Sequence, residues 1–227
     1  MAGISGPSRE RLLHILRILE AGAGAVLTSA ELETLSGWPS HTIRKDISCL
    51  GEPETPGEDP AGEAGTALGG KAGYNPEALA AAIRGALGLD RRRAFCVVGL
   101  GRLGSAFLNT DWNTGGNGSG GGGFELAAGF DTNVNRVEIL KSPAPLYPAY
   151  KMAGMISRLG IELALLCVPA GAAQASAEKL AAAGIRGIVN FAPATLTLPA
   201  GVTVQNVYVI DQLRALAVKM NQEVASD

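Results

Sequence analysis

A glycine-rich turn near the middle of the chain has the spacing that binds the pyrophosphate of a dinucleotide. It follows the apolar run 95–98, opens a helical pattern and reads Gly99-Leu100-Gly101-Arg102-Leu103-Gly104. In this arrangement the first glycine permits a tight turn, the second lets the backbone approach the phosphates, and the third lets the helix pack closely. The amides at the helix start then face an anion. The pattern predicts a dinucleotide site, and a glycine turn without ligand is the alternative.

A single acidic residue stands where the cofactor ribose is expected. Asp131 ends the next apolar run, 124–130, and Thr132 follows it. A carboxylate here accepts hydrogen bonds from ribose hydroxyls and repels a 2′-phosphate, so we predict NAD(H) rather than NADP(H). Asp131 lies farther from the turn than the usual distance of about 20 residues, and the glycine-rich insertion 114–123 explains the excess. A turn-forming or capping aspartate is the alternative.

Two later strand ends are expected to line the nicotinamide half of the same crevice, because loops at the carboxyl ends of parallel strands surround the ligand. They are Val168-Pro169 and 190–193. Ordinary packing by a proline and a phenylalanine explains these segments equally well. The predicted cofactor-binding residues are Gly99, Leu100, Gly101, Arg102, Leu103, Gly104, Asp131, Thr132, Val168, Pro169, Asn190, Phe191 and Pro193.

The first fifty residues have the pattern of a helix-turn-helix. We expect a helix over about 8–23, a second one that starts at the reciprocal capping pattern Thr28-Ser29-Ala30-Glu31, and a turn at 37–39. Ser40 is expected to cap a third helix, with Ile43 and Ile47 facing inward. An ordinary three-helix bundle with a solvated third helix has the same pattern. The candidate DNA-binding residues are Ser40, His41, Thr42, Arg44, Lys45, Ser48 and, beyond the helices, Lys71.

The charge of this N-terminal part is unfavourable for binding a polyanion. Residues 1–75 contain six basic and ten acidic side chains, and the segment 51–70 has five acidic residues but neither lysine nor arginine. The net charge of the whole chain is −2. Because affinity for duplex DNA depends on phosphate neutralisation by lysine and arginine, we expect local contacts and weak binding to ordinary duplex.

From residue 94 onwards, strand patterns alternate with helical ones. Strands are expected over 94–98, 124–130, 161–167, 185–190 and 202–209, and helices after 102, near 149–159 and over 172–183. A last helix carries Leu213, Leu216, Ala217 and Met220 on one face. This alternation predicts an α/β protein with a parallel, Rossmann-type sheet covered by helices on both faces.

Composition indicates a globular protein, with 47% hydrophobic and 5% aromatic residues. No signal peptide or membrane span is expected, so the predicted location is the cytoplasm. Cys49, Cys96 and Cys167 lie far apart, and they are interpreted as buried thiols without a disulfide framework or metal site.

An enzyme would need catalytic residues, and one pattern suggests them. Tyr147 and Lys151 have the Tyr-x-x-x-Lys spacing of short-chain dehydrogenases. In that class the tyrosine lies inside a long helix, whereas Tyr147 stands among prolines, which disfavour a helix. We therefore expect no catalysis.

Several motifs, in this order, give the chain a resemblance to the Rex family of bacterial redox-sensing transcriptional repressors. They are 44–48 followed by Gly51, Gly73-Tyr74, 98–104, Phe130-Asp131, Val168-Pro169 with Ala173-Gln174, and 190–193. The resemblance implies a winged helix-turn-helix domain over 1–78, a Rossmann NAD(H)-binding domain over 94–208, and a C-terminal helix over 209–227 that is exchanged in a homodimer. Between the two domains, the spacing of Leu79, Ile83 and Leu87 predicts a connecting helix over 79–93.

The resemblance also implies a mechanism. NADH binding would close the dimer and release it from a palindromic operator, NAD+ would compete without this effect, and Arg44 and Lys45 would contact the DNA. The switch would involve Arg17, but the family's tyrosine and aspartate are replaced here by Thr110 and Tyr208. With these replacements and the acidic segment, a dinucleotide- or CoA-binding regulator with weakened or lost DNA binding is the alternative.

Overall fold

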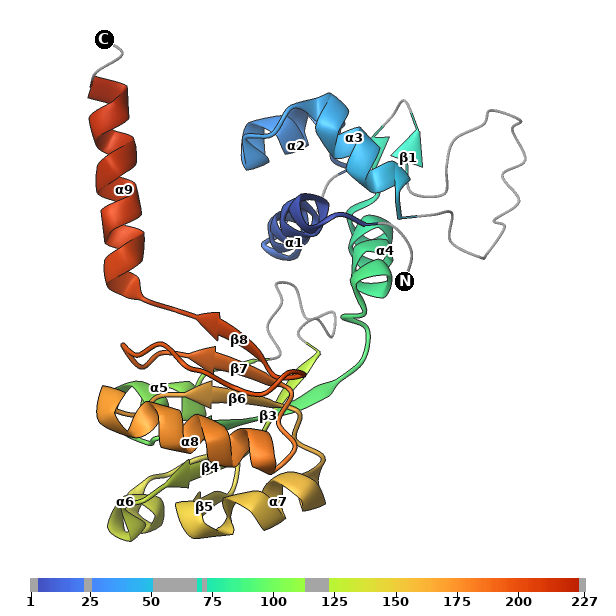
Figure 1. Ribbon diagram of the computed structural model, residues 1–227. Helices are drawn as coiled ribbons and strands as arrows, with labels where there is room; N and C mark the ends of the chain where they lie inside the picture. The colour runs from blue at the N-terminus through green and yellow to red at the C-terminus, as the bar shows by residue number, and fades with distance from the viewer. Residues whose placement is uncertain (1–3, 23–25, 51–68, 71–72, 113–122, 225–227) are drawn as a thin grey trace. The chain divides into compact units, whose positions relative to one another are not determined.

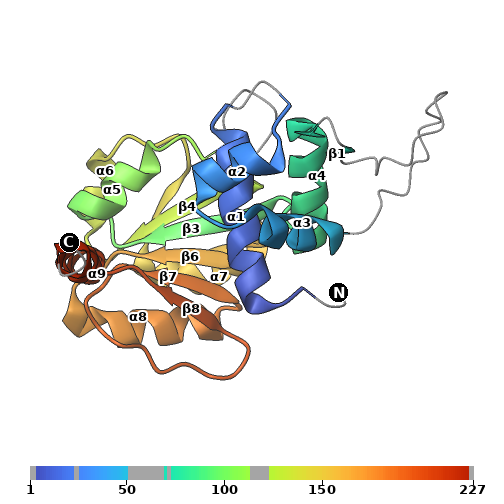
Figure 2. The same ribbon diagram turned by 90° about the horizontal axis from the view of Figure 1, so that it is seen from above.

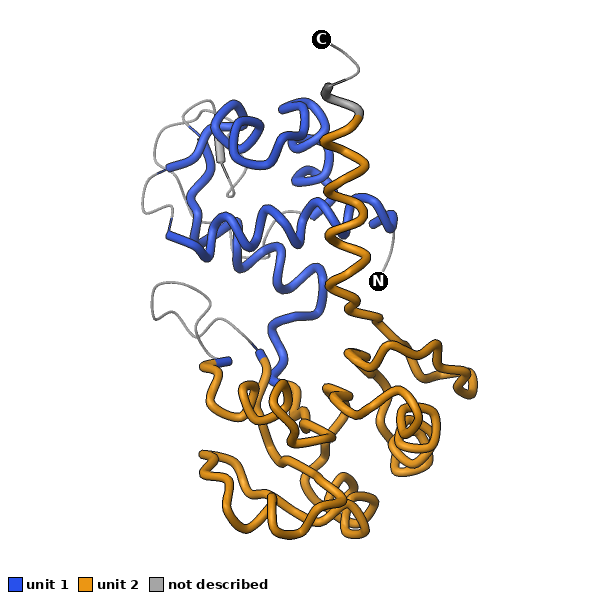
Figure 3. The backbone as a smooth tube through the Cα atoms, turned by 90° about the vertical axis from the view of Figure 1, so that its left-hand side faces the viewer, with its two compact units in different colours: residues 1–92, 112–123 blue, residues 93–111, 124–227 orange. Residues whose placement is uncertain are grey.

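The computed structural model describes residues 4–22, 26–50, 69–70, 73–112 and 123–224, which belong to two compact units (Figure 3). Unit 1 comprises residues 1–92 and 112–123, and unit 2 comprises residues 93–111 and 124–227. Most of the acidic segment, Lys71 and nearly all of the glycine-rich insertion lie outside the described residues. Each unit has a buried apolar core of its own.

Unit 1 begins with three helices whose apolar faces form one core. The helices are α1 (Gly6–Glu20), α2 (Ser29–Ser36) and α3 (Ser40–Ser48). Apolar side chains recur along them at helical spacing and turn to the same side, as in amphipathic helices in general. The core residues from these helices are Leu12, Ile15, Leu16, Leu19, Leu32, Ile43 and Ile47. The inward orientation predicted for Ile43 and Ile47 is confirmed.

The first turns of α2 and α3 are stabilised in different ways. The reciprocal cap predicted for α2 is confirmed, because the Glu31 amide donates to Thr28 Oγ1 and the Thr28 amide donates to the Glu31 carboxylate. The cap predicted for α3 is wrong: Pro39 is the N-cap and Ser40 is already helical. The Ser40 amide donates to the Glu33 carboxylate at 3.0 Å, so a side chain from α2 satisfies this free amide.

A small hairpin and a fourth helix complete unit 1. β1 (Gly69–Gly70) pairs antiparallel with β2 (Gly73–Tyr74), and the backbones of Leu27 and Tyr74 exchange two hydrogen bonds of 3.0 and 2.7 Å. α4 (Pro76–Leu87) is capped by Asn75 and buries Leu79 and Ile83. Three helices followed by a hairpin form the predicted winged helix-turn-helix.

The cysteines do not all have the predicted burial. Cys96 is buried and Cys167 is partly buried, but Cys49 is exposed. Cys49 follows the last residue of α3 and lies off the buried face that Ile43 and Ile47 form. Desolvation raises the pKa of the Cys96 and Cys167 thiols to about 12.

Unit 2 contains a six-stranded parallel sheet with the strand order β5-β4-β3-β6-β7-β8 (Figure 1). This is the Rossmann order, in which the chain starts at the centre and leaves a crevice where the winding direction reverses between β3 and β6. The predicted fold class is confirmed. The strands are β3 (Arg93–Val98), β4 (Phe124–Asp131), β5 (Leu146–Pro148), β6 (Leu163–Leu166), β7 (Gly187–Asn190) and β8 (Thr203–Asn206).

Helices cover both faces of this sheet (Figures 1 and 2). On one face, α7 (Met152–Leu159) and α8 (Ala170–Ala182) bury Ile156 and Leu180 against Phe130 of β4. On the other face lies α5 (Arg102–Leu108), and Leu108 is so close that a Cβ added at Gly129 would stand 3.3 Å from its side chain. α6 (Val134–Ile139) contacts β4 and β5.

Two short elements were not expected from the sequence, and several boundaries differ. The connecting helix expected over 79–93 spans Pro76–Leu87, because Arg93 already belongs to β3, and the first helix ends at Glu20. β5 and α6 were not predicted, because the prolines around β5 hide its strand pattern; proline is tolerated there because β5 is an edge strand. The strand predicted over 202–209 is too long, since β8 ends at Asn206 and Val209 begins a helix. The helix predicted near 149 starts with a 3₁₀ turn, Ala149–Lys151.

The C-terminal helix α9 (Val209–Val224) has an exposed apolar stripe. Leu213, Leu216 and Met220 are each more than half exposed. With Ala217 they recur at intervals of three and four residues, so they share one face of the helix. In the part of the chain that the structure describes, this face is left exposed to solvent.

Among the described residues, no helix is both long enough and apolar enough to cross a lipid bilayer.

Candidate functional site

The glycine turn connects β3 to α5, and its three glycines have three different surroundings. Gly99 has φ 89°, a backbone conformation that favours glycine, and a Cβ there would stand 2.6 Å from the Cys167 carbonyl oxygen. A Cβ on Gly104 would collide with the Gly99 carbonyl oxygen. At Gly101, by contrast, a Cβ would meet nothing within 4 Å. The first and third glycines therefore serve close packing, and the second leaves open space in front of the helix start.

Asp131 lies at the end of β4, directly beside this turn. Its carboxylate accepts hydrogen bonds from the Leu100 amide at 2.7 Å and the Asn133 amide at 2.7 Å, and it pairs with the Arg136 guanidinium at 3.0 Å. Burial acts to raise the pKa of Asp131, but the bonds from Asn133, Arg136 and Leu100 outweigh it and keep the pKa below its usual value. The site thus holds a fixed carboxylate anion.

A cavity of about 550 Å³ lies at the carboxyl ends of the strands in unit 2. This volume is within the range of small-molecule pockets, about 300–1,000 Å³. Of the predicted cofactor residues, it brings together Gly99, Gly101, Leu103, Asp131, Thr132, Val168, Pro169 and Phe191. It is also lined by residues that were not predicted to bind the cofactor: Val98, Phe130, Arg136, Ala149, Met152, Cys167, Ala172, Ser176 and Lys179.

Five predicted residues lie outside this lining. Leu100 and Gly104 are buried and support the turn, while Arg102 and Pro193 are exposed. Asn190 is buried and holds the loop after β7 together. Its side-chain amide donates to the Ala194 carbonyl oxygen and to Asn206 Oδ1, both at 2.9 Å, and its Oδ1 accepts from the Ala192 amide.

The predicted switch residues belong to different elements and to both units. Tyr208 belongs to the Asn190 network, since its hydroxyl donates to the Ala194 carbonyl oxygen at 2.9 Å. Thr110 is exposed after α5 and donates to the Ala106 carbonyl oxygen. Arg17 is exposed on α1 in unit 1. A role of these residues in switching stays a prediction.

The cavity fits a dinucleotide in shape and in charge. The open space at Gly101 is where a pyrophosphate would approach the α5 amides, and the Asp131 carboxylate could accept a ribose hydroxyl. Arg136 and Lys179 add positive charge to the lining, which suits a ligand with phosphate groups. A short-chain dehydrogenase pair is not assembled beside it: Tyr147 lies in β5 with its ring 6.0 Å from that of Phe130, whereas Lys151 lies over the ring of Tyr150.

The candidate nucleic-acid interface is the outer face of α3. His41, Arg44, Lys45 and Ser48 are exposed there, and Ser40 and Thr42 are partly buried. Lys71 lies outside the described residues.

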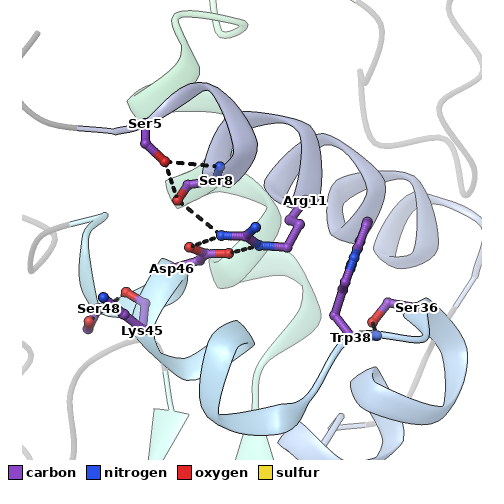
Figure 4. Close-up of polar contacts among 8 residues, drawn as sticks. All are labelled: Ser5, Ser8, Arg11, Ser36, Trp38, Lys45, Asp46 and Ser48. Atoms are coloured by element: carbon purple, nitrogen blue, oxygen red, sulfur yellow. Dashed lines mark hydrogen bonds and ion pairs between the residues drawn. The ribbon is translucent and has the colours of Figure 1, made fainter.

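The inner face of α3 carries a carboxylate that sequence reasoning missed. Asp46 is 2% exposed and forms a two-pronged ion pair with Arg11 of α1, with N–O distances of 2.5 and 2.9 Å (Figure 4). Arg11 also donates to the Ser8 hydroxyl. Burial acts to raise the pKa of Asp46, but hydrogen bonds from Arg11 and Ser8 prevail and leave the pKa below its usual value. Asp46 stands between Ile43 and Ile47 in the sequence, and this placement among inward residues was the available signal.

The sequence of residues 90–194 matches a family model described as a CoA binding domain. Among curated proteins, the chain is 36% identical to the redox-sensing transcriptional repressor Rex of Thermus thermophilus, over 87% of this chain and 84% of that protein. It is 32% identical to Rex of Limosilactobacillus reuteri, over 88% of this chain and 85% of that protein.

Solved structures of RSP, a Rex-family repressor, are similar over nearly the whole chain. RSP in complex with β-NADH has a TM-score of 0.75 and 28% identity, covering 99% of this chain and 98% of that one. RSP in complex with β-NAD+ and operator DNA has the same TM-score and identity, and covers 99% and 96%. Sequence identity over most of its length and the two-unit fold lead to one assignment: this chain belongs to the Rex family of redox-sensing transcriptional repressors.

Proposed function

We propose that this protein is an NADH-responsive transcriptional repressor that binds operator DNA as a homodimer and is released when NADH binds. The observation that carries the proposal is the cavity in unit 2, which joins the glycine turn, the start of α5 and the Asp131 carboxylate. The complexes of RSP with NADH, and with NAD+ and operator DNA, support it. We expect the protein to act in the cytoplasm, without catalysing a reaction, as the repressor names of its relatives suggest.

In this proposal, residues of unit 2 hold the dinucleotide at three points. The amides that follow Gly101 bind the pyrophosphate, and Asp131 accepts a hydrogen bond from the adenosine ribose. Val168, Pro169 and Phe191 line the nicotinamide end, where the oxidised and reduced rings differ in charge and shape. Leu100, Gly104 and Asn190 support these segments from outside the lining, and contacts from Arg102 and Pro193 stay predictions.

Unit 1 supplies the contacts with DNA. Arg44 and Lys45 are exposed on α3, the second helix of the helix-turn-helix, which enters the major groove in this class of domain. Their charges are local, since the N-terminal part of the chain is acidic overall. We therefore expect affinity for a specific operator to depend strongly on these two side chains.

The apolar stripe of α9 provides the contact between two copies of the chain. Leu213, Leu216, Ala217 and Met220 are exposed in one chain, and a helix of this kind buries such a stripe against another apolar surface. In a homodimer, two recognition helices meet two half-sites of a palindrome. A ligand that changes the dimer geometry then changes the spacing of the helices.

The decisive experiment measures binding of the full chain to a palindromic operator of the kind bound by Rex proteins, by fluorescence anisotropy with and without NADH or NAD+. We expect binding that NADH lowers and NAD+ does not. Replacing Arg44 or Lys45 by alanine should weaken binding and reduce the slope of log K against log salt by about 1 if the residue contacts a phosphate. Arg9→Ala, which removes an exposed arginine of α1, is the matched control.

Two results would reject parts of this function. If no operator binds even at low salt, the protein is a ligand-binding regulator without the DNA function, and titration calorimetry with NADH and CoA then identifies the ligand class. If DNA binding is unaffected by NADH although calorimetry detects NADH binding, redox sensing is rejected.

A further inference from the structure

The Asp131 carboxylate is largely occupied by the protein itself. An ionised carboxylate offers about four positions for hydrogen bonds. Oδ1 accepts from the Asn133 amide, and Oδ2 accepts from both the Leu100 amide and Arg136 Nη1. About one acceptor position is left, on Oδ1. Asp131 can therefore accept one ribose hydroxyl, but it cannot accept two without losing one of its protein partners.

Arg136 changes the charge that a ligand meets at this point. It forms an ion pair with Asp131, so the local charge is that of a neutral pair rather than that of a lone carboxylate. Its side chain is 43% exposed and lines the same cavity. Only one of its five N–H donors is bonded to Asp131, and no hydrogen bond joins the others to another described residue, so they can bind an anion.

There is also space next to the pair. A second cavity of about 560 Å³ adjoins the first and shares Thr132, Ala149, Met152 and Lys179 with it. Thr132 directly follows Asp131, and its side chain is exposed. A substituent on the adenosine ribose therefore has room, with the exposed guanidinium of Arg136 in the first cavity and the Lys179 ammonium in both cavities.

We propose that Arg136 determines the specificity of the ribose end of the cavity and that it admits a 2′-phosphate, so that NADPH is a second ligand of this protein. The inference rests on the proposed dinucleotide binding. A guanidinium binds phosphate oxygens through paired hydrogen bonds, and an arginine near the ribose accommodates the 2′-phosphate in NADP-binding Rossmann domains. The exclusion of NADP(H) predicted from Asp131 alone is thereby reduced to a modest preference for NADH.

The test is titration calorimetry of the full chain with NADH and NADPH in separate experiments. For the wild-type protein we expect dissociation constants within about tenfold of each other. Arg136→Ala should weaken NADPH binding by at least about tenfold and NADH binding by less than about threefold, because NADH has no 2′-phosphate for Arg136 to bind. Asp131→Asn should weaken NADH more than NADPH. Arg158→Ala, which removes an exposed arginine of α7 outside both cavities, should change neither.

Loss of Arg136 leaves a buried carboxylate without its ion pair, so Arg136→Lys is included as a variant that keeps the charge. It should bind NADH normally and NADPH with an intermediate affinity. If the wild-type protein binds NADH but not NADPH, or if Arg136→Ala weakens both equally, the inference is wrong while the proposed function stands. If the wild-type protein binds neither, the proposed function is wrong and this inference fails with it.

Discussion

Arg11 of α1 and Asp46 of α3 form a two-pronged ion pair on the side of α3 opposite its exposed cations (Figure 4). The side chain of Asp46 is 3% exposed and that of Arg11 is 20% exposed. Arg44 and Lys45 precede Asp46 directly and lie on the outer face of α3. The pair thus fixes the rotation of α3 about its own axis, and with it the direction in which the two cations face.

The first prediction concerns the stability of unit 1. Asp46→Asn should lower the free energy of unfolding by about 2 kcal/mol, which is less than the 3–5 kcal/mol of a fully buried pair because solvent reaches Arg11. Trp38, which packs against the core of unit 1, reports the transition by its fluorescence in a Trp112→Phe background. Glu10→Gln makes the same chemical change at an exposed site of α1 and should cost less than about 0.5 kcal/mol. Equal losses in the two variants would contradict the role of the ion pair.

The second prediction is the acid dependence of stability. The pKa values of Asp46 and Asp131 in the folded protein lie below the ordinary value of 3.8. Both groups therefore stabilise the folded state above the unfolded-state pKa, and this contribution is lost as the pH falls through the lower folded-state values. We expect denaturant midpoints to be insensitive to these groups above about pH 5 and to fall below about pH 4. Asp46→Asn should reduce the fall of the unit 1 denaturant midpoint at acid pH. An unchanged pH dependence in this variant would contradict the assignment.

The third prediction is the reactivity of the thiols. Cys49 is exposed, whereas Cys96 and Cys167 have pKa values of about 12 and stay protonated at neutral pH. Because the thiolate is the reactive form, one thiol per chain should react rapidly with a disulfide reagent in the native state, and three should react after denaturation. Cys49→Ser should abolish the fast phase. Fast labelling that persists in this variant would show that a second thiol is accessible.

The fourth prediction separates the two glycines of the turn that do not adopt a positive φ. Gly104→Ala places a methyl group against the Gly99 carbonyl oxygen, so it should destabilise unit 2 by about 1–3 kcal/mol. Gly101→Ala points into open space and should cost less than about 1 kcal/mol, yet it should weaken NADH binding by at least about tenfold, because the methyl group stands where the pyrophosphate approaches. Thermal unfolding and calorimetry measure the two effects. Normal NADH binding by Gly101→Ala would remove the turn from the binding site.

Most of the fold was predictable from long apolar patterns, but the short elements at the edge of the sheet were not. The strand at 94–98 and the amphipathic helices of unit 1 follow from local periodicity, which burial then enforces. β5 has three residues and contains Pro148, so its place in the sheet depends on pairing with β4 rather than on its own sequence. The pairing of β5 with β4 is a tertiary contact, which the local sequence pattern alone cannot predict.

The candidate site, too, has residues that the local pattern predicts and residues whose role depends on packing. The glycine turn and Asp131 follow a fixed spacing, and both lie at the predicted edge of the sheet. Arg136 and Lys179 reach the cavity from α6 and α8, and their role depends on how these helices pack, which no spacing rule describes. For Asn190 the sequence indicated the correct loop, but the fold uses its amide to join two chain segments inside the protein.

The Asn190 network has a mechanical consequence for the C-terminal helix. Asn190 ends β7 and stands next to Phe191 of the cavity, while its partners Asn206 and Tyr208 end β8 and precede α9. The helix therefore begins directly after a residue that is held in place, because the Tyr208 hydroxyl donates to the Ala194 carbonyl oxygen. When a helix moves as a rigid body about its first turn, a small tilt there produces a larger displacement at its far end. Because α9 spans 16 residues, or about 24 Å, a small shift beside Phe191 would displace the C-terminal end of the helix more than its start.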